Sequence, residues 1–139
     1  QKYRQRRYIV LSIAIHSLSS VSGETKVLNL ESKYSCALQL HNAILGGKWK
    51  LRILWHIHHG DTRFSTLKRG IPEISEKILA QQLRELEEHQ LIKRRVVTVM
   101  PPHVVYELSP DYPTLPAMLE VICEFAHGYA KAEGIKVED

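Results

Sequence analysis

Residues 75–89 contain an apolar stripe of helical spacing, and this stripe constrains the fold more than any other feature of the chain. Leu79, Leu83 and Leu86 recur at intervals of four and three residues, which places them on one face of an α-helix. Ser75 is suited to cap its first turn. Because a helix with one apolar face must bury that face, the segment predicts a helix packed against a core.

Shorter helices are predicted ahead of this one. Residues 36–45 and 49–60 carry apolar side chains at helical spacing, and glycine follows the first segment and ends the second. Ser65 is predicted to cap a small helix that ends near Gly70, because Pro72 prevents its continuation.

Extended structure is predicted after the long helix. Residues 92–99 and 104–108 are rich in β-branched side chains, and Pro101 and Pro102 separate them. The two segments therefore predict a β-hairpin. Helical spacing then returns over about residues 111–132.

A short helix, a turn, a longer helix and a hairpin follow one another in a winged helix-turn-helix, whose second helix enters the major groove of DNA. The predicted fold class is therefore mainly α with a small β-hairpin (α+β), a winged helix-turn-helix domain with terminal dimerisation helices. The 139 residues suffice for one core, and we assign the domain to residues 30–139.

Residues 1–29 are predicted to be a leader or an extension, and three origins are compatible with them. Basic residues precede an apolar stretch at 9–15, as in a signal peptide. That stretch has only seven residues, whereas spanning a bilayer takes roughly 20. The alternatives are an appended leader, an arm that packs on the domain and a targeting signal.

Charge is unevenly distributed along the chain, whose net charge is +4. Residues 48–95 carry eleven lysines and arginines against six acidic residues, whereas residues 107–139 carry two against seven. A basic middle and an acidic end suit a domain that contacts phosphate with one part and a protein with the other. The alternative is surface charge without a role.

The phase of the helix at 75–89 identifies its outer face. With the leucines inward, a rotation of about 100° per residue puts Lys77, Gln81 and Arg84 on the opposite side and Ala80 on a flank. Glutamine pairs with adenine, and arginine or lysine pairs with guanine, in the major groove. These residues are candidates for base contacts, and the alternative is an ordinary solvated face.

Candidate phosphate contacts surround this helix. Basic side chains position a protein on DNA without reading sequence, and the amides at a helix start can also bind phosphate. The predicted caps and the nearby basic residues form this group: Arg63, Ser65, Lys68, Ser75, Arg94, Arg95 and His103.

Several short motifs occur in a fixed order along residues 36–127. LGGKW follows Cys36, RF precedes the small helix, IS opens the long helix, LRELE closes it, and a Pro-bounded hairpin ends in a strand with tyrosine. In this order the chain resembles the HxlR family of MarR-related regulators. It departs from the family pattern at Gln90, where glycine is usual, and at His103, where arginine is common.

The resemblance implies a homodimer, formed by the N-terminal helix and the long C-terminal helix, on a pseudo-palindromic operator. The apolar spacing at 115–129 independently favours a partner, and the alternative is a helix that packs back on its own domain. The predicted interface comprises Leu40, Leu115, Met118, Leu119, Ile122, Ala126 and Tyr129.

Cys36 matches the family position at which, in some members, a thiol senses oxidants or electrophiles. A helix start near Lys33 would favour the reactive thiolate, whereas the alternative is a buried, inert cysteine. With two cysteines and no CxxC pair, the chain has no disulfide framework, so a reducing cytoplasm is the simplest location.

Other function classes provide alternatives. His56 and His59 lie at i and i+3 near Asp61, a spacing suited to a metal-responsive regulator, although imidazoles at a helix end also interact well with its dipole. We assign no metal ligand and no cofactor. No phosphate-binding glycine loop, nucleophile elbow or Ser/His/Asp set occurs, so an enzyme is not expected. A winged helix that binds protein or RNA is the last alternative.

The sequence thus predicts a homodimeric transcriptional regulator that binds double-stranded DNA sequence-specifically, with no membrane partner. It is expected to respond to an oxidant, an electrophile or a small ligand.

Overall fold

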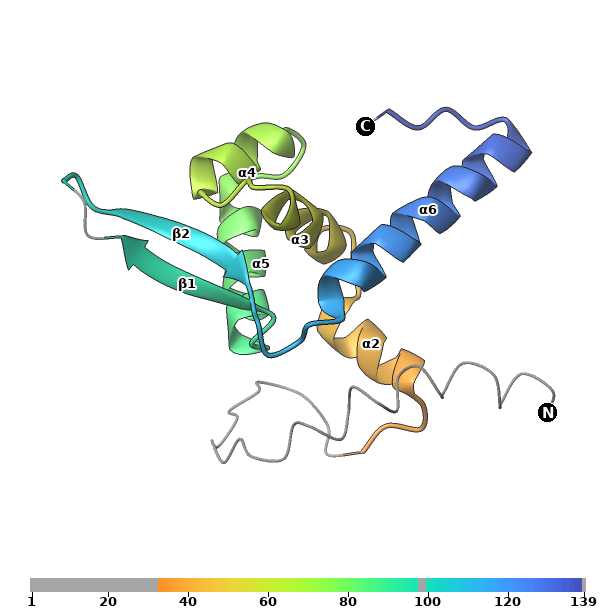
Figure 1. The fold of residues 1–139 in the computed structure, drawn as a ribbon, viewed down its shortest axis with the longest axis horizontal. Helices are drawn as coiled ribbons and strands as arrows, with labels where there is room; N and C mark the ends of the chain where they lie inside the picture. The colour runs from red at the N-terminus through yellow and green to blue at the C-terminus, as the bar shows by residue number, and fades with distance from the viewer. Residues whose placement is uncertain (1–32, 98–99, 139) are drawn as a thin grey trace.

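The computed structural model describes residues 33–97 and 100–138, so the predicted leader at 1–29 lies outside the described part. Within those ranges the chain forms five helices and one antiparallel hairpin, as predicted (Figure 1). The elements are α2 (Ala37–Leu45), α3 (Lys50–His58), α4 (Phe64–Gly70), α5 (Glu76–Glu88), β1 (Ile92–Val97), β2 (His103–Leu108) and α6 (Leu115–Glu133).

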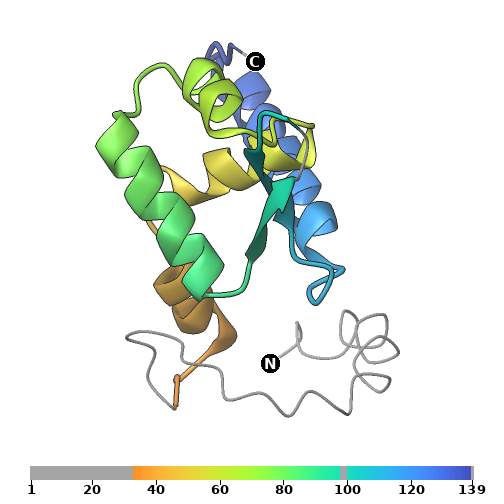
Figure 2. The same cartoon turned by 90° about the vertical axis from the view of Figure 1, so that its left-hand side faces the viewer.

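The helices α3, α4 and α5 form the body of the domain, and other elements project from it (Figure 1). The hairpin extends from one side and α6 from the other, so that most of α6 lies clear of the body. In the turned view, α5 lies at the edge of the body, with one side facing away from the other elements (Figure 2). This arrangement is that of a winged helix-turn-helix, in which α4 and α5 are the helix pair and the hairpin is the wing.

One hydrophobic core joins these elements. Ile53 and Leu54 of α3 meet the predicted stripe of α5, Leu79, Leu83 and Leu86, and each of these side chains is at most 2% exposed. The other buried members of the core are Leu45, Ile57, Leu67, Ile71, Ile74, Leu91, Ile92, Leu115 and Leu119. Burying one such side chain contributes about 1.5–3 kcal/mol, so the core fixes the rotation of α5.

The two predicted serine caps have different outcomes. Ser75 is the N-cap of α5, and its hydroxyl accepts a hydrogen bond from the Ile78 amide at 3.2 Å, as predicted. The prediction for Ser65 is wrong, because α4 begins at Phe64 and Arg63 occupies the N-cap. The Thr66 hydroxyl accepts from the Arg63 amide at 3.2 Å and donates to its carbonyl at 2.8 Å, which moves the helix start ahead of Ser65.

The glycine pair of the LGGKW motif shapes the turn between α2 and α3. A Cβ atom at Gly46 would lie 2.3 Å from the carbonyl oxygen of Asn42, so any larger residue would clash with the backbone. Gly47 has a φ of 102°, which side-chain-bearing residues rarely adopt. The motif is therefore explained by backbone geometry.

Backbone hydrogen bonds pair the two strands of the wing and tie the wing to the body. Its register runs from Ile92 opposite Leu108 to Val97 opposite His103. The Tyr106 amide donates to the Thr62 carbonyl at 2.7 Å, which ties β2 to the segment before α4.

Gln90 stands at the turn between α5 and β1 with a φ of 60°. Such a conformation costs a residue with a Cβ atom roughly 1–2 kcal/mol. The turn therefore accounts for the glycine that is usual at this place in the resembling family.

α6 is the longest described helix, with 19 residues, and Pro116 in its first turn and Gly134 at its end mark its limits. Leu115 and Leu119 anchor its first turns in the core. Within the described residues, no helix combines the length and the apolar character needed to cross a bilayer.

Candidate nucleic-acid interface

The outer face of α5 carries the side chains that the sequence assigns to base contact. Lys77, Ala80, Gln81 and Arg84 are all exposed, on the side opposite the buried stripe. The Gln81 amide donates a hydrogen bond to Glu85 at 3.1 Å, one turn further along the helix. The predicted phase of α5 is thus correct.

An ion pair connects α5 to α3 behind this face. Lys50 Nζ lies 2.7 Å from Glu85 Oε2, and the Lys50 side chain is only 10% exposed. The hydrogen bond from Lys50 is the main reason why the pKa of the Glu85 carboxyl is lowered, although partial burial acts in the opposite direction. The pair adds a polar restraint to the rotation of α5 next to Arg84.

Two predicted phosphate contacts meet where α4 begins and the wing returns. Arg63 Nη2 lies 3.2 Å from His103 Nε2, and the imidazole nitrogen must accept because a guanidinium only donates. Lys68 Nζ donates to the Pro72 carbonyl at 3.0 Å, in the turn that leads to α5. Ser65 is exposed in the first turn of α4.

The three basic residues of β1, Lys93, Arg94 and Arg95, differ in whether they form ion pairs. Arg95 pairs with Glu107 on β2, and Lys93 Nζ lies 2.9 Å from Asp111 Oδ2. The hydrogen bond from Lys93 is the largest cause that lowers the pKa of Asp111. Arg94 is exposed and pairs with no acidic group in the described part of the chain, so its charge is the most available of the three.

The residues predicted to form a dimer interface fall into three groups by burial. Leu115 and Leu119 are 5% and 2% exposed in the domain's own core, so they have no surface to offer a second chain. The prediction is corrected for these two residues, because the first turns of α6 pack on the body. Met118 also packs against the core, whereas Ile122 is half-buried. Ala126 and Tyr129, like Leu40 on α2, are exposed.

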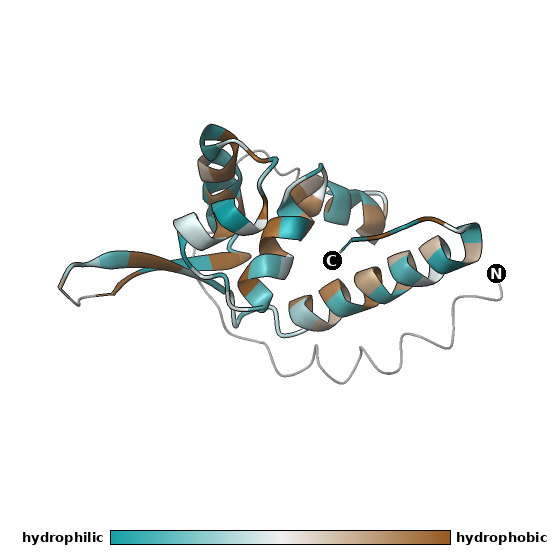
Figure 3. Cartoon of the chain, turned by 90° about the horizontal axis from the view of Figure 1, so that it is seen from above, coloured by the Kyte–Doolittle hydropathy of each residue, from teal (hydrophilic) through white to brown (hydrophobic). Residues whose placement is uncertain are grey.

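The projecting part of α6 has an exposed apolar face that includes residues missed by the sequence analysis. Val121, Phe125 and Tyr129 are 63%, 72% and 56% exposed, and the last two rings lie 6.5 Å apart. Together with Gly128 and Glu124 they border a shallow hollow of about 470 Å³. Figure 3 shows apolar positions recurring along α6. The spacing 121, 125, 129 could have been recognised as a helical stripe.

Comparison with known proteins identifies the family. The model of the HxlR-like helix-turn-helix family matches residues 44–134, which include the helix pair, the wing and α6. The chain belongs to the HxlR-like helix-turn-helix family. The resemblance inferred from the order of the motifs is therefore confirmed.

Alignments with two similar proteins cover most of the length of each of them. The chain is 44% identical to the HTH-type transcriptional regulator YtcD of Bacillus subtilis over 93 residues, which are 67% of this chain and 74% of the relative. It is 34% identical to an HTH-type transcriptional regulator of Methanothermobacter thermautotrophicus over 120 residues, 86% of this chain and 89% of that one.

Solved structures agree with this fold. The crystal structure of YtcD matches with a TM-score of 0.62 at 40% identity, over 69% of this chain and 98% of that chain. The redox regulator HypR in its oxidised form matches with a TM-score of 0.62 at 32% identity, over 67% and 96% of the two chains.

Cys36 lies just outside the residues that match the HxlR-like family model. It is the N-cap of α2, and it is exposed. The alternative of a buried cysteine is therefore wrong.

The histidine cluster differs from its predicted arrangement. His56 Nδ1 lies 2.9 Å from Asp61 Oδ2, so its partner is the aspartate. His58 and His59 instead turn towards Glu120 of α6. Glu120 lies 62 residues beyond His58 in the sequence, and no local pattern could have joined them.

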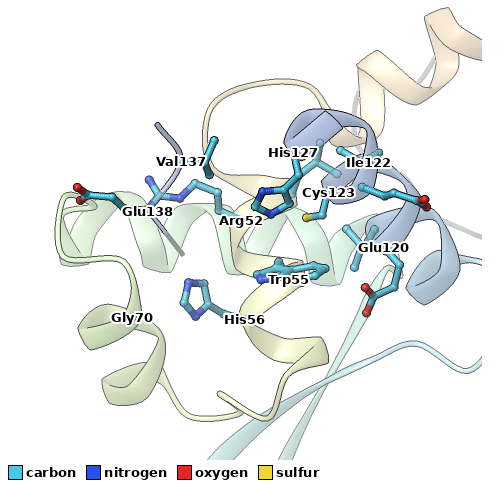
Figure 4. Close-up of a pocket in the computed structure, with 13 residues that line it drawn as sticks. Arg52, Trp55, His56, Gly70, Glu120, Ile122, Cys123, His127, Val137 and Glu138 are labelled. Atoms are coloured by element: carbon cyan, nitrogen blue, oxygen red, sulfur yellow. The ribbon is translucent and has the colours of Figure 1, made fainter. Parts of the chain in front are cut away.

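A groove of about 860 Å³ lies between α3, α6 and the chain that follows α6. Trp55 and His56 from α3 and Cys123 and His127 from α6 line it (Figure 4).

Proposed function

We propose that this chain is a cytoplasmic, sequence-specific regulator of transcription that binds double-stranded DNA as a homodimer. The single observation that carries the proposal is the exposed face of α5, which presents Gln81 and Arg84 at the edge of the body beside the basic wing. The family and its HTH-type transcriptional regulators support the same function.

In the proposed complex, the outer face of α5 enters the major groove. Lys77 and Arg84 are suited to guanine, Gln81 to adenine, and the methyl group of Ala80 to the methyl group of thymine. The basic side chains around α5 would bind phosphate, as would the amides at the starts of α4 and α5. The proposed phosphate contacts are Arg63, Ser65, Lys68, Ser75, Arg94, Arg95 and His103.

A homodimer is proposed because α6 projects from the body with an uncovered apolar face. A two-fold pair covers the same patch on both chains and presents two α5 helices about one DNA turn apart. The operator is then a pseudo-palindrome. The half-buried Ile122 and the exposed Ala126, Tyr129, Val121 and Phe125 form the proposed contact on α6, and Leu40 is the proposed contact on α2.

Substitutions on α5 and on the wing are expected to affect DNA binding differently. Gln81→Ala and Arg84→Ala each remove a base contact and should weaken binding to the preferred site by about 1–3 kcal/mol, with little effect on random duplex. Arg94→Ala removes a phosphate contact and should weaken binding to both DNAs alike. The measurement is fluorescence anisotropy with a duplex selected by the wild-type chain from a random library, at several salt concentrations.

Equal losses on selected and random DNA for all three variants would disprove the assignment of base contacts to α5. Failure of the wild type to enrich any duplex, combined with binding to RNA or to another protein, would favour the alternative of a winged helix that recognises those partners. Selected duplexes without two-fold symmetry would contradict the homodimeric arrangement.

Oxidation of Cys36 is proposed as the signal, since the thiol is exposed at the start of α2 and the structurally similar HypR is a redox regulator. Diamide takes one hydrogen atom from each of two thiols and leaves a disulfide, here between Cys36 and Cys36 of the partner subunit. This bond should lower the affinity for the selected duplex about tenfold, because α2 belongs to the proposed dimer contact. Cys36→Ser should abolish this response and leave DNA binding under reducing conditions unchanged.

Cys123→Ser provides the matched control and should respond to diamide as the wild type does. A response that follows Cys123 instead would transfer the signal to the groove between α3 and α6. Absence of any response would leave a small ligand in that groove as the alternative signal.

A further inference from the structure

Two histidines at the end of α3 and one glutamate of α6 bring three metal-ligating atoms together. His58 Nε2 lies 3.1 Å from Glu120 Oε1, and His59 Nε2 lies 3.8 Å from the same oxygen. One ligand atom from each side chain lies within 4.8 Å of the other two. The three side chains are 29%, 49% and 54% exposed, so an ion can reach them from solvent.

We propose that His58, His59 and Glu120 bind Zn²⁺ and that the ion fastens α6 to the end of α3. In a tetrahedral zinc site with bonds of about 2.0–2.2 Å, neighbouring ligand atoms lie roughly 3.3 Å apart. The two histidine–glutamate distances lie on either side of this value. Two imidazoles and one carboxylate are a ligand set that zinc accepts, and the fourth position is left for water.

The hydrogen bond from Nδ1 of His59 leaves the other ring nitrogen, Nε2, able to bind a metal. His59 Nδ1 lies 2.9 Å from the carbonyl oxygen of Trp55, and since a carbonyl only accepts, Nδ1 must carry the proton. The neutral ring then has its free lone pair on Nε2, the atom that faces Glu120. Metal-binding histidines commonly have such a bond from the second nitrogen, which fixes the tautomer and the ring orientation.

Trp55 also holds the two imidazoles by ring contacts. Its indole ring lies 4.0 Å from the His59 ring, centroid to centroid, and the His58 and His59 rings lie 4.9 Å apart in an edge-on arrangement. The nitrogens of two successive residues therefore converge on one point. This geometry distinguishes the site from His56, which is hydrogen-bonded to Asp61 instead.

The ion would link α3, which belongs to the body of the domain, to α6, which forms the proposed dimer contact. Glu120 follows the buried Leu119, at the place where α6 leaves the body. A bond from Glu120 through the ion to the end of α3 would fix the direction in which α6 projects. The zinc site is a proposal separate from DNA binding, because zinc binding can be measured without DNA.

Calorimetric titration of the full, reduced chain with Zn²⁺ tests the site. We expect one ion per chain at this site, and we expect Glu120→Gln to weaken its binding at least about tenfold, since the amide loses the charged ligand. His58→Ala and His59→Ala should weaken it by at least the same factor. Glu124→Gln, on the next turn of α6, is the carboxylate control, and His41→Asn on α2 is the histidine control; both should bind as the wild type does.

Thermal unfolding gives a second readout that depends on the link between the helices. Zn²⁺ should raise the Tm of the wild type and of Glu124→Gln by several degrees, and that of Glu120→Gln by clearly less at the same zinc concentration. Equal zinc affinity in the wild type and in Glu120→Gln would overturn the proposal, since the ion would then not contact α6. The proposal would also be overturned if the wild type bound no zinc, or if His58→Ala and His59→Ala bound it as tightly as the wild type does.

Discussion

Replacing Phe125 with glutamate should convert the proposed dimer into monomers. Phe125 is 72% exposed near the middle of the apolar face of α6, and its ring neighbours that of Tyr129. A charged side chain there would have to be buried without a partner, beside the acidic Glu124. Sedimentation or light scattering over a range of chain concentrations measures the change.

The expected size of the effect follows from symmetry. Burying one phenylalanine contributes about 1.5–3 kcal/mol, and a two-fold interface loses the contact on both chains. The total of roughly 3–6 kcal/mol weakens dimerisation by at least about a hundredfold, before the cost of burying charge is added. Affinity for the selected duplex should fall in parallel, because a monomer contacts only one half-site.

Val96→Glu is a matched control, since Val96 is a comparably exposed apolar residue that lies on β1 instead of α6. This variant should keep the oligomeric state of the wild type. A Phe125→Glu chain that remains dimeric would place the interface elsewhere, with the exposed side chains of α2 as the next candidate.

Patterns within one element predict that element well. The spacing of Leu79, Leu83 and Leu86 correctly gave both the buried and the exposed face of α5, because a regular helix fixes both at once. Ser65 shows the limit of local patterns, since two hydrogen bonds between Arg63 and Thr66 decided where α4 begins. Several residues there could have capped the helix equally well.

Features that depend on the packing of distant elements were predicted less well. The apolar residues of α6 follow one periodicity, but Leu119 packs into the core and Phe125 faces solvent, because α6 leaves the body between them. The approach of Glu120 to His58 depends on the same departure. Sequence spacing describes rotation about a helix axis, whereas these features depend on where the axis points.

Removing Glu85 should destabilise the domain by about 2–3 kcal/mol. Lys50 is 10% exposed, and among the described residues Glu85 is the only acid within ion-pair distance of it. Glu85→Ala therefore leaves a nearly buried ammonium group without its charge partner, which commonly costs about 3–5 kcal/mol for a fully buried pair. We reduce that value because the Glu85 side chain is 32% exposed.

The opposite substitution should be much milder. Lys50→Met keeps most of the buried methylene chain, and Glu85 retains its exposure to water and its hydrogen bond from Gln81. We expect a loss below about 1 kcal/mol, and the double variant Lys50→Met, Glu85→Leu should approach wild-type stability. Urea unfolding of the wild type, Lys50→Met, Glu85→Leu and the double variant gives a double-mutant cycle. Equal losses in the two single variants would show that the burial of Lys50 does not decide the energetics.

The same pair predicts how stability depends on pH. Because Lys50 lowers the pKa of Glu85 below its ordinary value of 4.5, the folded state binds a proton at this carboxyl less readily than the unfolded state does. The stabilisation is thus fully present above the unfolded pKa and is lost as pH falls through the lower, folded pKa. Wild type and Glu85→Ala should therefore differ most at neutral pH and converge in acid. A difference that stays constant from neutral pH to well below 4.5 would mean that the charge of Glu85 does not stabilise the contact between α3 and α5.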